Sequence, residues 1–107
     1  MQKGEIVLVN FPFTNYQGQK IRPAVVLFSN ENDSTLTFIT SETKWKTEND
    51  IVLKPSKRNG LKEISLIRIN KISTIENNLI LGQLGLLCPE EIKNLNLNLK
   101  KLLQLDT

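Results

Sequence analysis

The chain has 107 residues, 39% of them hydrophobic, with 14 lysines and arginines against 11 aspartates and glutamates. This length suits one domain, and we expect residues 1–107 to form it around a modest core. The net charge of +3 permits nucleic acid as a partner without requiring it. Histidine is absent and Cys88 is the single cysteine, which excludes histidine-based catalysis and an intrachain disulfide.

The sequence also indicates the cellular compartment of the protein. The apolar runs are too short to span a bilayer, and the N-terminus begins on a strand pattern rather than a signal segment. One unpaired cysteine fits a reducing environment. We therefore expect a soluble, cytoplasmic protein.

The first half of the chain is predicted to be β-structure. Residues 5–11 and 23–29 form two apolar, β-branched runs that flank a polar loop at 15–20. Pro23 suits the first position of a strand because proline lacks an N–H. Residues 30–34 have the composition of a turn.

Further short strands are expected at 35–40 and 50–53, followed by a basic loop at 54–60. The apolar pattern of residues 64–75 indicates a strand, a bend near Asn70 and Lys71, and another strand. Short strands separated by frequent turn signals favour a small barrel or a sandwich.

The C-terminal segment predicts an amphipathic helix that begins at Pro89 and has Glu90 and Glu91 in its first turn. Cys88 would be the N-cap, where serine or aspartate is preferred. One apolar stripe recurs at helical spacing and contains Ile92, Leu95, Leu99 and either Leu102 or Leu103.

Arg22 is the first candidate functional residue because it lies where the polar loop meets the second strand. An arginine is a fixed cation that binds phosphate through a planar fork of donors. The alternative is a structural arginine paired with a carboxylate at the rim of the sheet.

Two other short segments could contact a phosphate. The hydroxyls of Thr40 and Ser41 could hold a phosphate oxygen or a ribose hydroxyl, or could simply form a turn at the end of a strand. Arg68 and Asn70 alternate along a strand and should share one face. That face suits phosphate and base-edge contacts, or is merely a polar solvent face.

Basic residues gather in two loops, with Trp45 and Phe38 nearby; they are Lys44, Lys46, Lys54, Lys57, Arg58 and Lys62. Cations interleaved with aromatic rings can bind single-stranded bases. Trp45 could instead cover the edge of the core.

No metal-ligand cluster or glycine-rich phosphate loop is present, so no metal or cofactor is expected. Glu5, Glu42 and Asp50 are the carboxylates that could act as a base.

The order of several segments resembles the MazF/PemK family of type II toxins over nearly the whole chain. The matching pieces are 4–9, 22–27, Ile39-Thr40, 65–72, 81–85 and a helix entered at Pro89-Glu90. The resemblance implies a mainly β (α+β) fold, an SH3-like β-barrel with added short helices and a C-terminal amphipathic helix. It also implies a homodimer inhibited by an antitoxin with an acidic, disordered segment.

By this resemblance the chain is a metal-independent endoribonuclease that cleaves single-stranded mRNA through its 2′-hydroxyl. Arg22, Thr40 and Arg68 would be catalytic. The RNA would be bound by a further set: Gln17, Gln19, Lys20, Ser41, Lys44, Lys57, Arg58 and Asn70.

The chain also departs from the family pattern. Asn70 stands where the PemK-like branch has an aspartate, and Gln17 stands where some members have glutamate or histidine. Neither side chain can act as a general base, so positioning and electrostatic stabilisation would carry the catalysis. The alternative function is a non-catalytic barrel, either a CcdB-like gyrase inhibitor or a module that binds RNA without cleaving it.

Overall fold

The computed structural model describes residues 1–12 and 19–105. Most of the loop expected at 15–20 therefore lies outside the described residues. In chain order the elements are β1 (Glu5–Pro12), β2 (Gln19–Ser29), β3 (Asp33–Thr40), η1 (Thr43–Trp45), β4 (Ile51–Leu53), β5 (Ser65–Glu76), η2 (Asn77–Leu79), β6 (Ile80–Leu86) and α1 (Pro89–Leu102).

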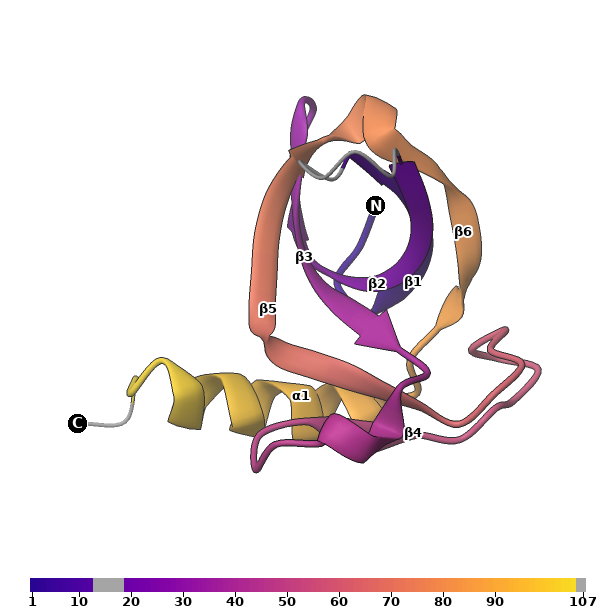
Figure 1. Cartoon of the computed structure of the whole chain (residues 1–107). Helices are drawn as coiled ribbons and strands as arrows, with labels where there is room; N and C mark the ends of the chain where they lie inside the picture. The colour runs from indigo at the N-terminus through magenta and orange to yellow at the C-terminus, as the bar shows by residue number, and fades with distance from the viewer. Residues whose placement is uncertain (13–18, 106–107) are drawn as a thin grey trace.

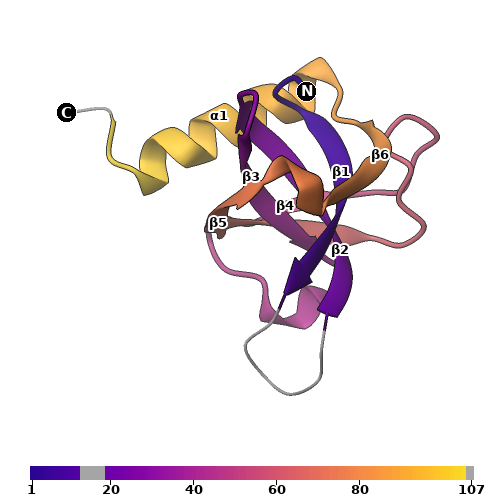
Figure 2. The same cartoon turned by 90° about the horizontal axis from the view of Figure 1, so that it is seen from above.

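The strands form one antiparallel sheet in the order β4-β5-β3-β2-β1-β6. The sheet curls round until it almost closes on itself, and α1 lies outside this ring, below it and beside β5 (Figure 1). Seen from above, α1 is at the opposite side of the molecule from the end of β1 and the start of β2 (Figure 2). The expected barrel-like, mainly β fold with a C-terminal helix is confirmed.

Two apolar clusters form the core because successive residues of a strand point to opposite faces of the sheet. Ile6 and Val7 are adjacent in β1, yet each is buried in a different cluster. The first cluster includes Ile39 and Ile67 and is covered by Leu95 of α1. The second cluster is formed by the other face of the curled sheet and contains Val9, Ala24, Val26, Leu36 and Ile75 besides Val7.

The helix begins at Pro89, as the sequence predicts. Cys88 is a weak N-cap, but its backbone N–H donates to the Glu91 carboxylate at 2.8 Å, which satisfies one of the exposed donors of the first turn. Leu95 is fully buried, and Leu102 rather than Leu103 completes the apolar stripe against the core.

β5 is one continuous strand rather than two strands around a bend. Its pairing with β3 is irregular, because Thr37 pairs with Ile72 whereas Ile39 pairs with Ile67. The extra β5 residues between these pairs make a bulge, and a bulge bends a strand without ending it. The change of direction is visible in Figure 1.

One strand limit and one further strand also differ from the prediction. β2 begins at Gln19, so Pro23 lies inside the strand, where it pairs with Leu8. Its pairing with β3 begins only at Ala24, so no partner on that side needs the missing N–H of Pro23. β6 was not predicted as a strand, because Gly82 and Gly85 interrupt the apolar alternation.

Gly85 fixes the basic loop at 54–60 against β6. A Cβ at this position would lie 2.4 Å from the backbone of Arg58 and Asn59, whereas a Cβ at Gly82 has no neighbour within 4 Å. We expect Gly85→Ala to lower the free energy of unfolding by about 1–3 kcal/mol through overpacking. Gly82→Ala is the matched control and should unfold at the urea concentration of the wild type. Equal midpoints for the two variants would contradict this close approach.

Candidate active site

Three neighbouring strands bring together the three residues predicted to be catalytic. Arg22 lies in β2, Thr40 ends β3 and Arg68 lies in β5, and β3 is between the other two strands. The β2–β3 register pairs Ala24 with Phe38, and its extension by two residues places Arg22 across from Thr40. These sequence positions are far apart, so the sheet topology creates the cluster.

Two adjoining cavities open at this cluster, and Arg22, Ile39 and Thr40 line both of them. The larger cavity has a volume of about 510 Å³ and is completed by Lys20, Ile21, Pro23, Ser41, Leu61, Lys62, Glu63 and Ser65. The smaller has a volume of about 260 Å³ and is completed by Phe11, Phe38, Arg68 and Lys71. The shared residues make the two cavities one continuous site.

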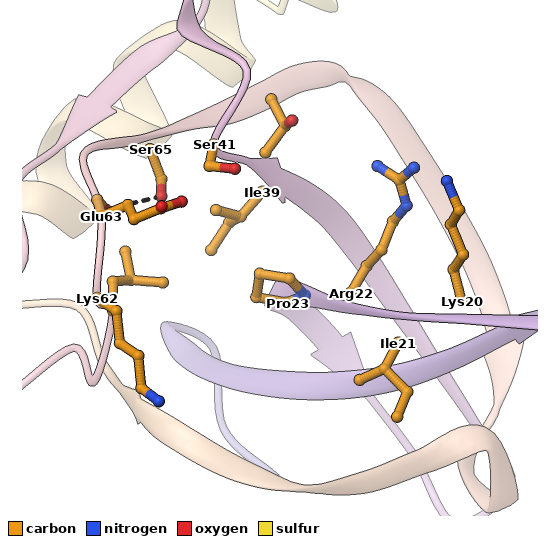
Figure 3. Close-up of a pocket in the computed structure, with 11 residues that line it drawn as sticks. Lys20, Ile21, Arg22, Pro23, Ile39, Ser41, Lys62, Glu63 and Ser65 are labelled. Carbon is orange, nitrogen blue, oxygen red and sulfur yellow. Dashed lines mark hydrogen bonds between the residues drawn. The ribbon is translucent and has the colours of Figure 1, made fainter.

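The larger cavity has two cations on one side, and polar oxygens together with a third cation, Lys62, on the other (Figure 3). The side chains of Lys20 and Arg22 extend in the same direction from β2. Ser41 and Ser65 lie across the cavity with Glu63, whose carbonyl oxygen accepts a hydrogen bond from the Ser65 hydroxyl at 2.9 Å. An extended anion could contact Lys20 and Arg22 while its other polar groups form hydrogen bonds with the serine hydroxyls.

Thr40 presents a hydroxyl donor. Its Oγ1 accepts a hydrogen bond from the backbone N–H of Glu42 at 3.1 Å, so the local turn expected at this strand end is present. That bond fixes the oxygen and leaves the hydroxyl proton to donate into the site. The structural and functional interpretations of Thr40 are therefore compatible.

The smaller cavity combines aromatic rings with cations. Phe11 and Phe38 pack edge to face, with ring centroids 5.2 Å apart and ring planes at 76°. Arg68 and Lys71 line the same cavity. An apolar wall beside cations suits an unstacked base joined to its phosphate.

Arg68 is anchored at both its backbone and its side chain. Its carbonyl oxygen accepts a hydrogen bond from Thr37 Oγ1 at 2.7 Å. Its Nε lies 3.2 Å from Oδ2 of Asp50, whose side chain is completely buried. Glu5 and Glu42, the other carboxylates considered as bases, line neither cavity; Glu5 accepts a hydrogen bond from the backbone N–H of Gln2.

The residues predicted to bind RNA do not all lie at this site. Lys20 and Ser41 line the larger cavity. Lys44 is exposed on η1, with its Nζ 5.5 Å from the ring of Trp45. Lys57 and Arg58 line neither cavity, and the Arg58 guanidinium donates to the carbonyl of Leu87. Gln17 and the side chain of Gln19 lie outside the described residues.

One expected neighbour and one alternative from the sequence are not found at the site. Lys71 lines the smaller cavity with Arg68 whereas Asn70 does not, and the pairing of β5 with β3 is irregular around these residues. Trp45 is 66% exposed and so does not cover the edge of the core.

Several lining residues were not singled out from the sequence, namely Phe11, Glu63, Ser65 and Lys71. The position of Phe11 beside Phe38 depends on strand pairing, and no local pattern reveals it. No functional role was assigned from the sequence to Lys71, which is the residue after the predicted pair of Arg68 and Asn70.

Neither a metal site nor a membrane span is found in the described part of the chain. Over residues 1–12 and 19–105, no three His, Cys, Asp or Glu side chains gather closely enough to hold a metal ion. Within the same ranges, no helix has the length and apolar character needed to cross a bilayer.

Solved structures similar to this chain share its fold. Mycobacterium tuberculosis toxin MazF-mt6 matches with a TM-score of 0.77 at 18% identity, over 96% of this chain and 99% of its own. An endoribonuclease from mycobacterial species in complex with its cognate antitoxin matches with a TM-score of 0.76 at 17% identity, over 100% of this chain and 98% of its own. No curated protein sequence is similar enough to count as a match.

The sequence itself identifies the family. Residues 2–103 match the family model described as PemK-like, MazF-like toxin of type II toxin-antitoxin system. The match includes all the strands and α1, and therefore every described residue of the two cavities. The chain belongs to the PemK-like, MazF-like toxins of type II toxin-antitoxin systems.

Proposed function

We propose that this toxin is an endoribonuclease that cleaves single-stranded RNA by attack of a ribose 2′-hydroxyl on the adjacent phosphate. The observation that carries this proposal is the convergence of Arg22, Thr40 and Arg68 on two connected cavities. Family membership and the endoribonucleases among the similar structures support it.

In the proposed reaction the 2′-oxygen forms a bond to phosphorus, and the bond from phosphorus to the 5′-oxygen breaks. Arg22 stabilises the added negative charge of the pentacoordinate phosphate, and the Thr40 hydroxyl donates to a non-bridging oxygen. Arg68, which lines the smaller cavity, supplies a second cation. The 2′-hydroxyl loses its proton and the 5′-oxygen gains one, so the products carry a 2′,3′-cyclic phosphate and a 5′-hydroxyl.

The proposed RNA path follows both cavities. Lys20, Lys62 and Lys71 contact phosphates, Ser41 contacts a phosphate or ribose oxygen, and the Phe11 and Phe38 pair lies against a base. Lys44 beside Trp45 could extend the path beyond the cavities. Single-stranded RNA fits because its bases are free to leave their stack.

We further propose that residues 1–107 act as one cytoplasmic domain, as a homodimer. A cognate antitoxin would inhibit it by laying an acidic, disordered segment across the same cations. Carboxylates and phosphates compete for such a surface, and a disordered segment can cover a large area of it. The antitoxin bound to a similar mycobacterial endoribonuclease supports this partner.

The test of the function is cleavage of one long RNA by the purified toxin in excess EDTA. We expect cleavage to proceed, because the reaction proposed here uses an internal nucleophile and side chains alone. End analysis should find 2′,3′-cyclic phosphates and 5′-hydroxyls. Intact RNA, strict dependence on Mg²⁺ or 5′-phosphate ends would refute this mechanism, and bound but uncut RNA would favour the non-catalytic alternative.

The pH dependence of the rate should lack a maximum near neutrality. Histidine titrates near pH 6.5 and gives many RNA-cleaving enzymes a bell-shaped profile, but this chain has no histidine. The logarithm of the single-turnover rate should rise from about pH 5 to 9, as the 2′-hydroxyl becomes easier to deprotonate. A bell centred near pH 6.5–7 would contradict the proposed electrostatic mechanism.

An inflection at acid pH would identify a carboxylate base instead. Glu63 is the carboxylate that lines the larger cavity, so Glu63→Gln should then abolish the inflection. Glu42→Gln is the matched control, because Glu42 is exposed and lines neither cavity.

A further inference from the structure

Asp50 is a buried acidic residue directly behind the proposed active site. Its side chain is completely buried, whereas that of Arg68 is 21% exposed and reaches the smaller cavity. Asp50 itself lines neither of the two cavities. A carboxylate in this position cannot touch a substrate, so it cannot act as the missing general base.

Strand pairing brings Asp50 to Arg68. β4 pairs with β5 through Ile51 and Ile67, and extension of this register by one residue places Asp50 opposite Arg68. Side chains of opposite charge attract each other when they lie directly opposite on neighbouring strands. The 3.2 Å separation of Nε and Oδ2 is therefore a consequence of the register rather than of a long, adaptable surface contact.

The same carboxylate oxygen is also held by the loop that precedes β4. Oδ2 also accepts a hydrogen bond from the backbone N–H of Thr47 at 2.9 Å, and the Asp50 N–H donates back to the Thr47 carbonyl at 3.1 Å. The carbonyl oxygen of the preceding residue, Asn49, accepts a hydrogen bond from the Asn98 side chain of α1 at 3.0 Å. Asp50 thus has a fixed position relative to the core.

We propose that Asp50 is the positioning residue of Arg68, an inference that rests on the proposed endoribonuclease function. The carboxylate lies beside Nε of the guanidinium as an ion pair without hydrogen-bond geometry. The two terminal nitrogens make no ion pair with Asp50 and remain for a phosphate of the RNA. A guanidinium held at one edge presents its other donors in a defined plane, so it pays less conformational entropy when the transition state forms.

The test compares Asp50→Asn with Glu48→Gln. Asparagine keeps the shape of the side chain and an oxygen for the Thr47 N–H, but it removes the charge that holds Arg68. Glu48 is an exposed carboxylate of the same loop, so its change to glutamine is the matched control for charge. We expect Asp50→Asn to lower the single-turnover cleavage rate by at least ~10-fold, because small displacements of a catalytic group are costly. Glu48→Gln should cleave at the wild-type rate.

Binding separates positioning from simple loss of the fold. Affinity for an RNA with a 2′-deoxy nucleotide at the cleavage point, which cannot react, should stay within about 2-fold of the wild type in Asp50→Asn. Rates in an Arg68→Gln background should not fall further when Asp50→Asn is added, since the group to be positioned is already gone. A further loss equal to that in the wild-type background would overturn the proposal, as would wild-type cleavage by Asp50→Asn.

The wild-type protein gives a readout that is independent of activity. The chain has three arginines, so their Nε–Hε groups can be assigned by NMR. The Hε of Arg68, whose Nε is buried beside the Asp50 carboxylate, should exchange with water more slowly in the wild type than in Asp50→Asn. Equal exchange rates in the two proteins would overturn the proposal even if RNA is cleaved. Slower exchange in a wild-type protein that does not cleave RNA would instead refute the proposed function and leave the Asp50–Arg68 pair in place.

Discussion

Arg22→Ala should lower RNA cleavage by at least ~10²-fold while the protein stays folded, the loss typical of removing one preorganised stabilising donor. Arg22 lines both cavities, so it can reach a phosphate that lies where they meet. Its backbone is held on one side by pairing with Val9 of β1, and alanine keeps that pairing. The measurement is single-turnover cleavage of a short RNA, with circular dichroism to confirm the fold.

The controls for Arg22 separate its geometry from its charge. Arg22→Lys keeps the charge but loses the planar fork of donors, so it should recover only part of the lost rate. Lys57→Ala removes one exposed cation that lines neither cavity, and it should cleave nearly as fast as the wild type. Wild-type cleavage by a folded Arg22→Ala protein would remove Arg22 from the mechanism.

Arg68→Ala should lower the free energy of unfolding by about 3–5 kcal/mol, because removing one partner of a buried ion pair leaves the other charge uncompensated. Asp50 is that partner; its Oδ1 is buried without a hydrogen-bond partner among the described residues, and Oδ2 would keep only the Thr47 N–H. The midpoint of urea denaturation measures the effect. Because part of the Arg68→Ala protein is expected to be unfolded, its cleavage rate has to be divided by the fraction of folded protein before it is compared with that of the wild type.

The double variant Asp50→Asn/Arg68→Ala distinguishes the buried charge from lost packing. It removes the unpaired carboxylate, so it should be more stable than Arg68→Ala alone although it carries one more substitution. If the two losses of stability simply add, the ion pair has no coupling energy, and the destabilisation comes from the lost arginine stem.

Local sequence patterns predicted most of the elements. The apolar run at 5–11 and the stripe from Ile92 to Leu102 fall where β1 and α1 are found, because burial of one face imposes a period on the sequence. β6 was not predicted because its sequence shows no alternating buried face. Gly85 allows the close approach of the loop at 54–60, and Gly82 has open space around it in this edge strand beside β1.

The site was predictable only in part. Arg22, Thr40 and Arg68 were suggested by family resemblance. They meet because β5 pairs with β3 in the sheet, although β4 separates these two strands in the sequence. The role of Asp50 required the register between β4 and β5, and a one-residue shift would turn it to the opposite face. Lys71 rather than Asn70 lines the smaller cavity with Arg68, where the pairing of β5 with β3 is irregular.

The pairing of β1 with β6 sets an order of events during synthesis. All the described residues of the two cavities lie between Phe11 and Lys71, yet one edge of β1 is covered only by residues 80–86. A chain that stops on the ribosome before this segment emerges would expose an unpaired strand edge that contains Val7 and Val9, which is a template for aggregation. An incomplete copy of the toxin therefore carries the residues of the site on a sheet that lacks its edge strand β6, and we expect such a fragment to aggregate rather than to act as a toxin.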